Sequence, residues 1–160
     1  MVEWYLDTEN ICNMRKFGFI LDDFDNKYDR LFVVYQSSTR GSLNKFKSTK
    51  NCCSFLKGAM VDYVECTLKG AKRGRLDRFI ISKMPKKVGE LRVGGNNLPL
   101  TVDRVYVVSN DKGYLKYLFR GGFYLRSFCV SKNGKCYEVQ DWYRGPEGNG
   151  LWSTRKVDRR

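Results

Sequence analysis

The sequence contains no histidine, so it lacks a side chain that commonly serves as a general acid or base in enzymes. Nucleophilic catalysis that pairs serine or cysteine with histidine is therefore excluded. The six cysteines form no Cys-x-x-Cys pair, which excludes a zinc site of the usual Cys and His composition. Any chemistry must use carboxylates, a metal ion, lysine, tyrosine or cysteine. We expect most of the cysteines to be buried, reduced thiols.

Long apolar runs are absent as well. No stretch approaches the ~18 to 20 apolar residues that span a bilayer, and the N-terminus has no basic segment leading into an apolar core. We therefore predict a cytoplasmic protein that has neither a membrane span nor a signal peptide. A chain of 160 residues, of which 42% are hydrophobic, is long enough for one domain with a single core.

Basic residues are in clear excess over acidic ones. Thirty Lys and Arg stand against 17 Asp and Glu, which gives a net charge of +13. This balance favours a polyanionic partner such as nucleic acid. Charge alone does not distinguish such a partner from an anionic surface or from simple solubility.

Short apolar runs alternate with helical periodicity along most of the chain. Strands are expected near residues 2–6, 31–35, 60–66, 105–108 and 123–128. Helices are expected within residues 11–30, 43–57, 76–84 and 115–119. The alternation predicts an α/β fold, in which helices cover both faces of a mostly parallel central sheet in a three-layer α/β/α arrangement.

Two segments do not follow this alternation. Residues 86–100 are basic and rich in Gly and Asn, and they are typical of a long irregular insertion or a small hairpin flap. Residues 131–160 form a basic tail that also carries Tyr137, Trp142, Tyr143 and Trp152. We assign residues 1–130 to the main domain and residues 131–160 to a C-terminal extension packed on it or flanking it.

Acidic residues follow three of the expected strands. Asp7 and Glu9 come after the first, and Asp111 follows the strand at 105–108. Asp77 lies in the first turn of the helix after the third strand, where the helix dipole by itself would favour an acid. Ligands of parallel α/β sheets bind in the crevice at the carboxyl ends of the strands. We therefore expect these carboxylates to face a single crevice.

Several carboxylates in one crevice repel each other unless they take up protons or share a cation. Oxygen ligands fit Mg²⁺ or Mn²⁺, which can activate water and polarise a phosphoryl oxygen during in-line displacement. Five cations near these acids would suit the phosphates of a nucleic-acid backbone, although a solvated basic loop would look the same. They are Lys69, Lys72, Arg73, Arg75 and Lys112.

Three segments together resemble the PIN-like and NYN nucleases. They are Asp7-Thr8-Glu9-Asn10, Leu76-Asp77 behind a Lys- and Gly-containing loop, and Val107-Val108-Ser109-Asn110-Asp111-Lys112-Gly113-Tyr114. The resemblance covers roughly residues 2 to 130, and its order and spacing carry it rather than any single motif. The chain departs from the family pattern at residues 86–100 and in the tail after residue 130.

The resemblance implies a PIN-like, metal-dependent ribonuclease with four catalytic acids. Asp7, Asp77 and Asp111 would bind Mg²⁺ or Mn²⁺, and Glu9 would be a further ligand or would orient water. Asn10 and Ser109 would be polar supports. The implied substrate is nucleic acid, with RNA favoured over DNA.

Other interpretations stay open from the sequence alone. A PIN-like fold could bind RNA or DNA without cutting it, and charge together with aromatic residues would serve a binder equally well. A toxin-type ribonuclease would need a protein inhibitor, for which the positive charge is suited, and the tail could form a homodimer contact. A haloacid dehalogenase-like phosphatase is disfavoured, because that family has aspartate where this chain has Glu9. A second acidic cluster, Asp22, Asp23 and Asp25, is expected on the solvated surface.

Overall fold

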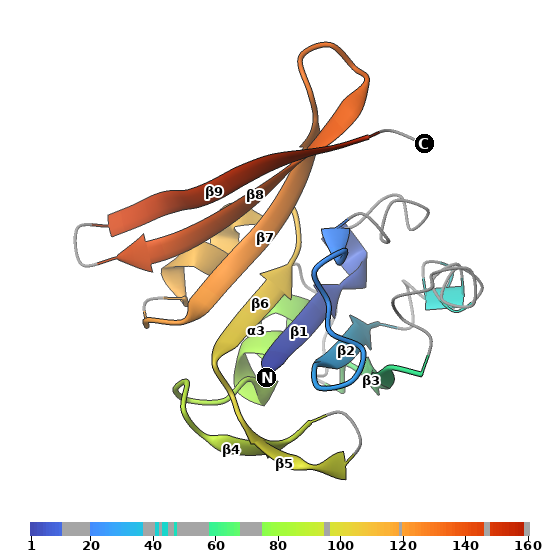
Figure 1. Ribbon diagram of the computed structural model, residues 1–160, viewed down its shortest axis with the longest axis vertical. Coiled ribbons are helices and arrows are strands. Elements are labelled where there is room, and N and C mark those ends of the chain that lie inside the picture. Colours follow the sequence, from blue (N-terminus) through green and yellow to red (C-terminus); the bar gives the residue numbers. More distant parts are fainter. Residues whose placement is uncertain are drawn as a thin grey trace.

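The computed structural model describes residues 1–10, 20–36, 41, 43–44, 47, 58–67, 75–94, 97–118, 120–145 and 148–158. For Asn10, Arg75 and the described residues after Tyr143 it describes the backbone only. A seven-stranded mixed sheet runs through the molecule in the order β3-β2-β1-β6-β7-β8-β9 (Figure 1). None of the helices in these ranges combines the length and the apolar character needed to cross a membrane.

Five neighbouring strands of this sheet are parallel. They are β1 (Val2–Asp7), β2 (Arg30–Tyr35), β3 (Met60–Glu65), β6 (Arg104–Val108) and β7 (Phe123–Val130). The antiparallel strands β8 (Cys136–Gly145) and β9 (Gly148–Asp158) continue the sheet beyond β7. A separate antiparallel pair is formed by β4 (Leu91–Val93) and β5 (Pro99–Thr101). The helices with described bounds are η1 (Thr8–Asn10), α3 (Arg75–Lys83) and η6 (Lys112–Lys116), of which η1 and η6 are 3₁₀ helices.

The central strand β1 is buried on both of its faces. Trp4 and Leu6 belong to one apolar cluster, which is covered by the segment from Ile20 to Phe24. Tyr5 belongs to a second cluster on the opposite face, which is covered by α3 and η6. Burial on both faces is what the near-continuous apolar runs of a parallel sheet predict. The polar groups at the end of β1 are therefore held by a strand with no exposed side.

The predicted α/β fold with a mostly parallel sheet is confirmed. The helix expected at 76–84 is α3, shifted by one residue. The helix expected at 115–119 is the 3₁₀ helix η6, which begins at Lys112 because the Asp111 carboxylate caps it by accepting a hydrogen bond from the backbone of Gly113 at 2.8 Å. The helices expected within 11–30 and 43–57 fall largely outside the described residues.

The segment at 86–100 contributes to a hairpin, the second of the two forms that we expected for it. The hairpin of β4 and β5 lies beside the start of β1, at the end of the sheet opposite to Asp7 (Figure 1). The N-terminal amine ties it there, because it donates to the carbonyl of Thr101 and pairs with Asp103, each at 2.8 Å. The hairpin therefore does not cover the carboxyl edge of the sheet.

A buried arginine joins three segments on the other side of β1. Arg126 on β7 is 2% exposed and donates to Asp23 at 2.6 Å and to Asp141 on β8 at 2.7 Å. Its guanidinium also lies over the rings of Trp4 and Tyr106. Asp23, which was expected on the solvated surface, keeps half of its side chain exposed but serves as an ion-pair partner.

Candidate active site at the carboxyl edge of the sheet

The candidate site lies where the strand order reverses direction. β1 has β2 and β3 on one side and β6 and β7 on the other, so the chain crosses from one half of the sheet to the other between β3 and β6 (Figure 1). Open parallel sheets bind ligands at such a reversal, outside the carboxyl ends of the strands. Leu6 on β1 pairs with Val108 on β6, which brings the following residues, Asp7 and Ser109, side by side.

Asp7 is fully buried, and hydrogen bonds from Ser109, Tyr114 and Glu9 help to hold its carboxylate. Its Oδ2 accepts from the Ser109 hydroxyl at 2.9 Å and from the Tyr114 hydroxyl at 3.0 Å, and its Oδ1 accepts from the backbone N–H of Glu9 at 3.0 Å. A buried carboxylate is costly to remove from water unless donors of this kind replace its hydration. These bonds fix the orientation of the Asp7 carboxylate.

Ser109 connects Asp7 to the second acid of the site. Its Oγ donates to Asp7 and accepts from the backbone N–H of Asp111 at 3.1 Å. The turn that follows is tight, since a Cβ on Gly113 would lie 2.9 Å from Oδ1 of Asp111. The Ser-Asn-Asp-Lys-Gly segment thus needs its serine to link the two acids and its glycine to let the cap form.

The hydroxyl of Tyr114 lies against Asp7 and feels the charges of two further acids. Burial raises the pKa of Tyr114 above its ordinary value, and the charge and hydrogen bond of Asp7 raise this pKa further. The charges of Asp77 and Asp111 also raise the pKa of Tyr114. Of the predicted acids, Asp7 contacts the Tyr114 hydroxyl, and Asp77 and Asp111 act on it through their charges alone. That all of these acids face one crevice stays a prediction.

Tyr114 is the member of the site to which the sequence assigned no role. It is fully buried in η6, and its ring packs in the apolar cluster that also contains Leu76 and Ile80 of α3. Its only signal in the sequence was its position three residues after Asp111, within a segment of the family resemblance. That position gave no indication that its hydroxyl would reach β1.

Asp77 and Asp111 are less constrained than Asp7. Oδ1 of Asp77 accepts from the backbone N–H of Arg78 at 2.6 Å, and Oδ1 of Asp111 accepts from Gly113. Within the described ranges, no donor contacts Oδ2 of either residue. Among the described residues, each therefore keeps one carboxylate oxygen that a cation could use.

The described carboxylate oxygens alone do not form a complete metal-binding site. In the part of the chain that the structure describes, no three acidic or cysteine side chains are grouped closely enough to hold a metal ion on their own. Mg²⁺ usually needs fewer protein ligands, because one or two carboxylates bind it while waters and substrate phosphates complete its coordination. The open oxygens of Asp77 and Asp111 fit that requirement.

The remaining predicted residues lie around this centre or outside the described chain. Glu9 is exposed in η1 and holds Asp7 through its backbone N–H, while Asn10 ends η1 with its side chain undescribed. Nζ of Lys112 lies 4.3 Å from the ring centre of Trp142 on β8. Of the other expected cations, Arg75 begins α3 with an undescribed side chain, and the rest lie outside the described residues: Lys69, Lys72 and Arg73.

Neither a scan against protein-family models nor a search of curated proteins finds a match to this chain. The likeness to PIN-like and NYN nucleases therefore stays a resemblance, carried by the residues alone.

Proposed function

We propose that this protein is a metal-dependent nuclease that hydrolyses phosphodiester bonds and prefers RNA. The observation that carries the proposal is the placement of Asp7 and Asp111 at the carboxyl edge of the sheet, where the Ser109 hydroxyl bonds to the carboxylate of Asp7 and to the backbone N–H of Asp111. An all-oxygen ligand set suits Mg²⁺ or Mn²⁺. The net charge of +13 supports a polyanionic substrate.

The acids have separate roles in this proposal. Asp77 and Asp111 offer their Oδ2 atoms, which no described donor contacts, as metal ligands, and Asp7 provides the third carboxylate from the end of β1. The ion, when bound, supplies activation of a water molecule and stabilisation of negative charge on the phosphoryl oxygens. Ser109 and Tyr114 keep the Asp7 carboxylate in one orientation. Glu9 is close enough in sequence to act as a further ligand or to orient the attacking water.

The substrate contacts proposed from the sequence come shortly before Asp77 and directly after Asp111 in the chain. Lys112 follows Asp111 directly and would contact a phosphate next to the cleaved bond. The basic segment from 69 to 75 leads into α3, and hence into Asp77, so it would contact the same strand of nucleic acid. The proposal includes a PIN-like, three-layer α/β/α fold, which is supported by apolar clusters on both faces of β1.

A second candidate function is binding of nucleic acid without cleavage. It is favoured by the lack, among the described residues, of three grouped metal-ligating side chains. The basic charge of the chain would serve a binder equally well.

Metal-dependent turnover separates the two candidates. Single-stranded RNA and DNA of the same sequence are incubated with the protein in Mn²⁺, in Mg²⁺ and in EDTA, and the products are resolved by length. We expect cleavage with either ion, faster cleavage of RNA than of DNA, and none in EDTA. Tight RNA binding without products under either ion would support the binder, and the absence of both binding and cleavage would contradict both functions.

A further inference from the structure

Lys112 begins η6 directly after Asp111, and its side chain is exposed. A lysine in this position could neutralise the neighbouring acid by direct contact. Among the described residues, however, no carboxylate forms an ion pair with its ammonium group. The ammonium lies instead over the indole ring of Trp142 on β8, with Nζ 4.3 Å from the ring centre. This distance is well inside the ~6 Å range of a cation–π interaction.

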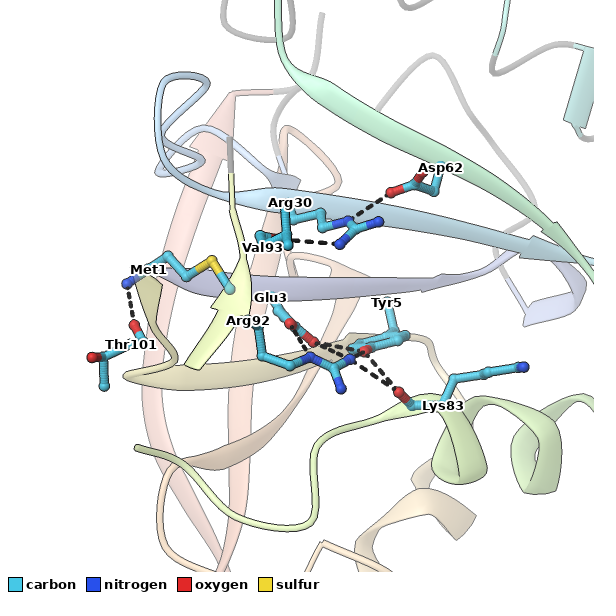
Figure 2. A network of polar contacts seen from close by, with 9 residues as sticks. All are labelled: Met1, Glu3, Tyr5, Arg30, Asp62, Lys83, Arg92, Val93 and Thr101. Atoms are coloured by element: carbon cyan, nitrogen blue, oxygen red, sulfur yellow. Dashed lines mark hydrogen bonds and ion pairs between the residues drawn. The ribbon is translucent and has the colours of Figure 1, made fainter. Parts of the chain in front are cut away.

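Two arginines beside the start of β1 are held in a different way. Nε of Arg92 donates to the carboxylate of Glu3 at 2.9 Å, and Nε of Arg30 donates to that of Asp62 at 2.7 Å (Figure 2). A carboxylate of the protein therefore offsets each of these charges. An aromatic ring attracts a cation through its quadrupole and supplies no negative charge. The ammonium of Lys112 thus keeps its full charge, together with N–H donors that a phosphate oxygen can accept from.

The indole ring of Trp142 is itself held in one orientation. Its Nε1 donates to the Ser127 hydroxyl on β7 at 2.8 Å, and the backbone of Trp142 pairs with that of Leu125. The ring is partly buried and packs against the apolar cluster that α3 and η6 cover. It therefore gives the flexible Lys112 side chain a fixed surface. Ordering a lysine when a ligand binds costs conformational entropy, and a ring that orders it in advance lowers that cost.

The ammonium of Lys112 lies beside the carboxyl edge of the sheet. β6 ends where Val108 pairs with Arg126, and β7 continues past this point to Val130. Cys129 lies in this continuation. Burial raises the pKa of Cys129 and the charge of Glu138 raises it further, whereas the charge of Lys112 acts in the opposite direction. Lys112 is therefore directed along β7 and β8, on the side of Asp111 where these strands extend beyond β6.

We propose that Trp142 is a positioning residue: it holds the ammonium of Lys112 at the carboxyl edge, where Lys112 binds a phosphate of single-stranded nucleic acid. The inference rests on the proposed function, because it needs a nucleic-acid substrate at this edge. It assigns the C-terminal extension a role in substrate binding, since Trp142 belongs to β8. The acids then supply the chemistry, and the pair of Lys112 and Trp142 supplies affinity for the substrate.

The test is a double-mutant cycle on RNA affinity. A short, labelled single-stranded RNA is titrated with the protein in EDTA, which removes the metal that cleavage requires, and its fluorescence anisotropy is followed. We expect Lys112→Met to weaken binding about fivefold and Trp142→Leu about threefold, since an exposed cation–π contact contributes a factor of roughly two to five. The double variant should bind as Lys112→Met does, because Trp142 acts through Lys112. Losses that multiply, or wild-type binding by Trp142→Leu, would overturn the proposal.

Matched variants separate positioning from a structural role. Trp142→Phe keeps an aromatic face for Lys112 and should regain most of the binding that Trp142→Leu loses. Lys116→Met removes another exposed cation of η6, whose Nζ lies 5.0 Å from the ring centre of Tyr117, and should weaken binding less than Lys112→Met does. An equal loss in Lys116→Met would show that overall charge decides binding, which would overturn the role of Lys112. If Trp142→Leu is unfolded in urea titrations, Ser127→Ala takes its place in the cycle, because it removes only the hydroxyl that orients the indole.

The inference and the proposed nuclease function fail in different ways. RNA cleavage in Mn²⁺ together with binding losses that multiply would keep the nuclease and remove the role of Trp142. A non-additive cycle without cleavage under any ion would keep the pair of Lys112 and Trp142 in a binding protein and remove the nuclease. Absence of RNA binding by the wild-type protein in EDTA would overturn the inference outright.

Discussion

Tyr114→Phe removes one hydroxyl from the centre of the candidate site and leaves the ring in place. The ring is fully buried and packs in the cluster on the α3 face, so the substitution opens no cavity of consequence. What disappears is the 3.0 Å hydrogen bond from the hydroxyl to Oδ2 of Asp7. Because Asp7 has no exposed surface, water does not replace the missing donor.

The expected cost follows from the charge of the acceptor. A hydrogen bond to a charged group contributes about 1.5 to 3 kcal/mol, compared with about 1 kcal/mol for a neutral pair. We therefore expect Tyr114→Phe to lower the free energy of unfolding by about 2 kcal/mol at pH 7, measured by urea denaturation. Tyr117→Phe makes the same chemical change three residues along, at a partly exposed ring of the same segment. That control should stay within about 0.5 kcal/mol of the wild type.

The Tyr114 hydroxyl should also make the free energy of unfolding depend on pH in alkaline solution. Burial and the neighbouring carboxylates raise the pKa of Tyr114 in the folded state, so the folded protein keeps a proton that the unfolded chain loses above about pH 10. The contribution is complete below that pH, and it falls by about 1.4 kcal/mol per pH unit above it. Burial and Glu3 raise the pKa of Tyr5 as well, which doubles the slope. Tyr114→Phe should remove about half of the slope that these two residues produce.

Two outcomes would refute this reasoning. If Tyr114→Phe were as stable as the wild type at pH 7, the hydroxyl would not be satisfying a buried charge. If its stability declined between pH 10 and pH 11.5 as steeply as that of the wild type, Tyr114 would ionise at its ordinary pKa, which contradicts its burial beside Asp7.

Two further substitutions test the fold that positions the site. Arg126→Met leaves the carboxylate of Asp141, which is 5% exposed, without its ion-pair partner. We expect it to lower the free energy of unfolding in urea by about 3 to 5 kcal/mol. A loss below about 1 kcal/mol would contradict a buried ion pair. Gly122→Ala forces a side chain into a backbone with φ of +88°, where its Cβ would lie 2.5 Å from Val88. It should lower the free energy of unfolding by about 1 to 3 kcal/mol, whereas Gly121→Ala, with nothing within 4 Å, should cost far less.

The sheet could be predicted because its strands have distinctive sequences. The runs Leu31–Tyr35 and Val105–Val108 are apolar throughout, as strands covered on both faces must be. Each ends in a change to polar residues, and parallel strands bring such ends to one edge. The sequence therefore predicted that Asp7 and Asp111 lie at the same edge of the sheet, and the pairing of Leu6 with Val108 places the ends of β1 and β6 side by side.

The buried charges could not be predicted, because their partners are distant in the sequence. An arginine in an alternating strand is usually exposed, but Arg126 is buried. Its partner Asp23 is 103 residues away in the sequence. Glu3 and Arg92 are separated by 89 residues. Periodicity identifies which face a residue occupies, but it does not reveal whether a charge on that face meets a partner.

The tail was not predicted to form strands. Residues 136–158 alternate charged and aromatic side chains with several glycines, a composition that fits a loop as well as an exposed hairpin. In the structure β8 pairs with β7 from Leu125 to Val130, and β9 pairs with β8. A backbone edge on β7 was available for this pairing, and edge pairing depends on backbone hydrogen bonds more than on sequence.

Strand β1 carries a row of buried polar side chains that ends at the candidate active site. Glu3, Tyr5 and Asp7 alternate along the same face of the strand, and none of them has exposed surface. Glu3 pairs with Arg92, Tyr5 stacks on Phe32, and Asp7 accepts from Ser109. Burying polar side chains in an apolar core costs free energy unless each has a hydrogen-bond partner, and each of these three has one.

The most direct test of the central claim is the cleavage rate of Asp111→Asn on single-stranded RNA in Mn²⁺. Asparagine keeps an oxygen that can accept from the N–H of Gly113, so the cap of η6 survives and only the charge is lost. Asp25→Asn makes the same change in an equivalent turn, where Asp25 accepts from the N–H of Lys27 at 3.0 Å. This turn precedes β2, which is parallel to β1, so it lies toward the end of the sheet opposite to Asp7. We predict that Asp111→Asn cleaves at least about 100-fold more slowly and that Asp25→Asn cleaves at the wild-type rate. Wild-type cleavage by a folded Asp111→Asn protein would contradict the claim that these carboxylates form the catalytic centre.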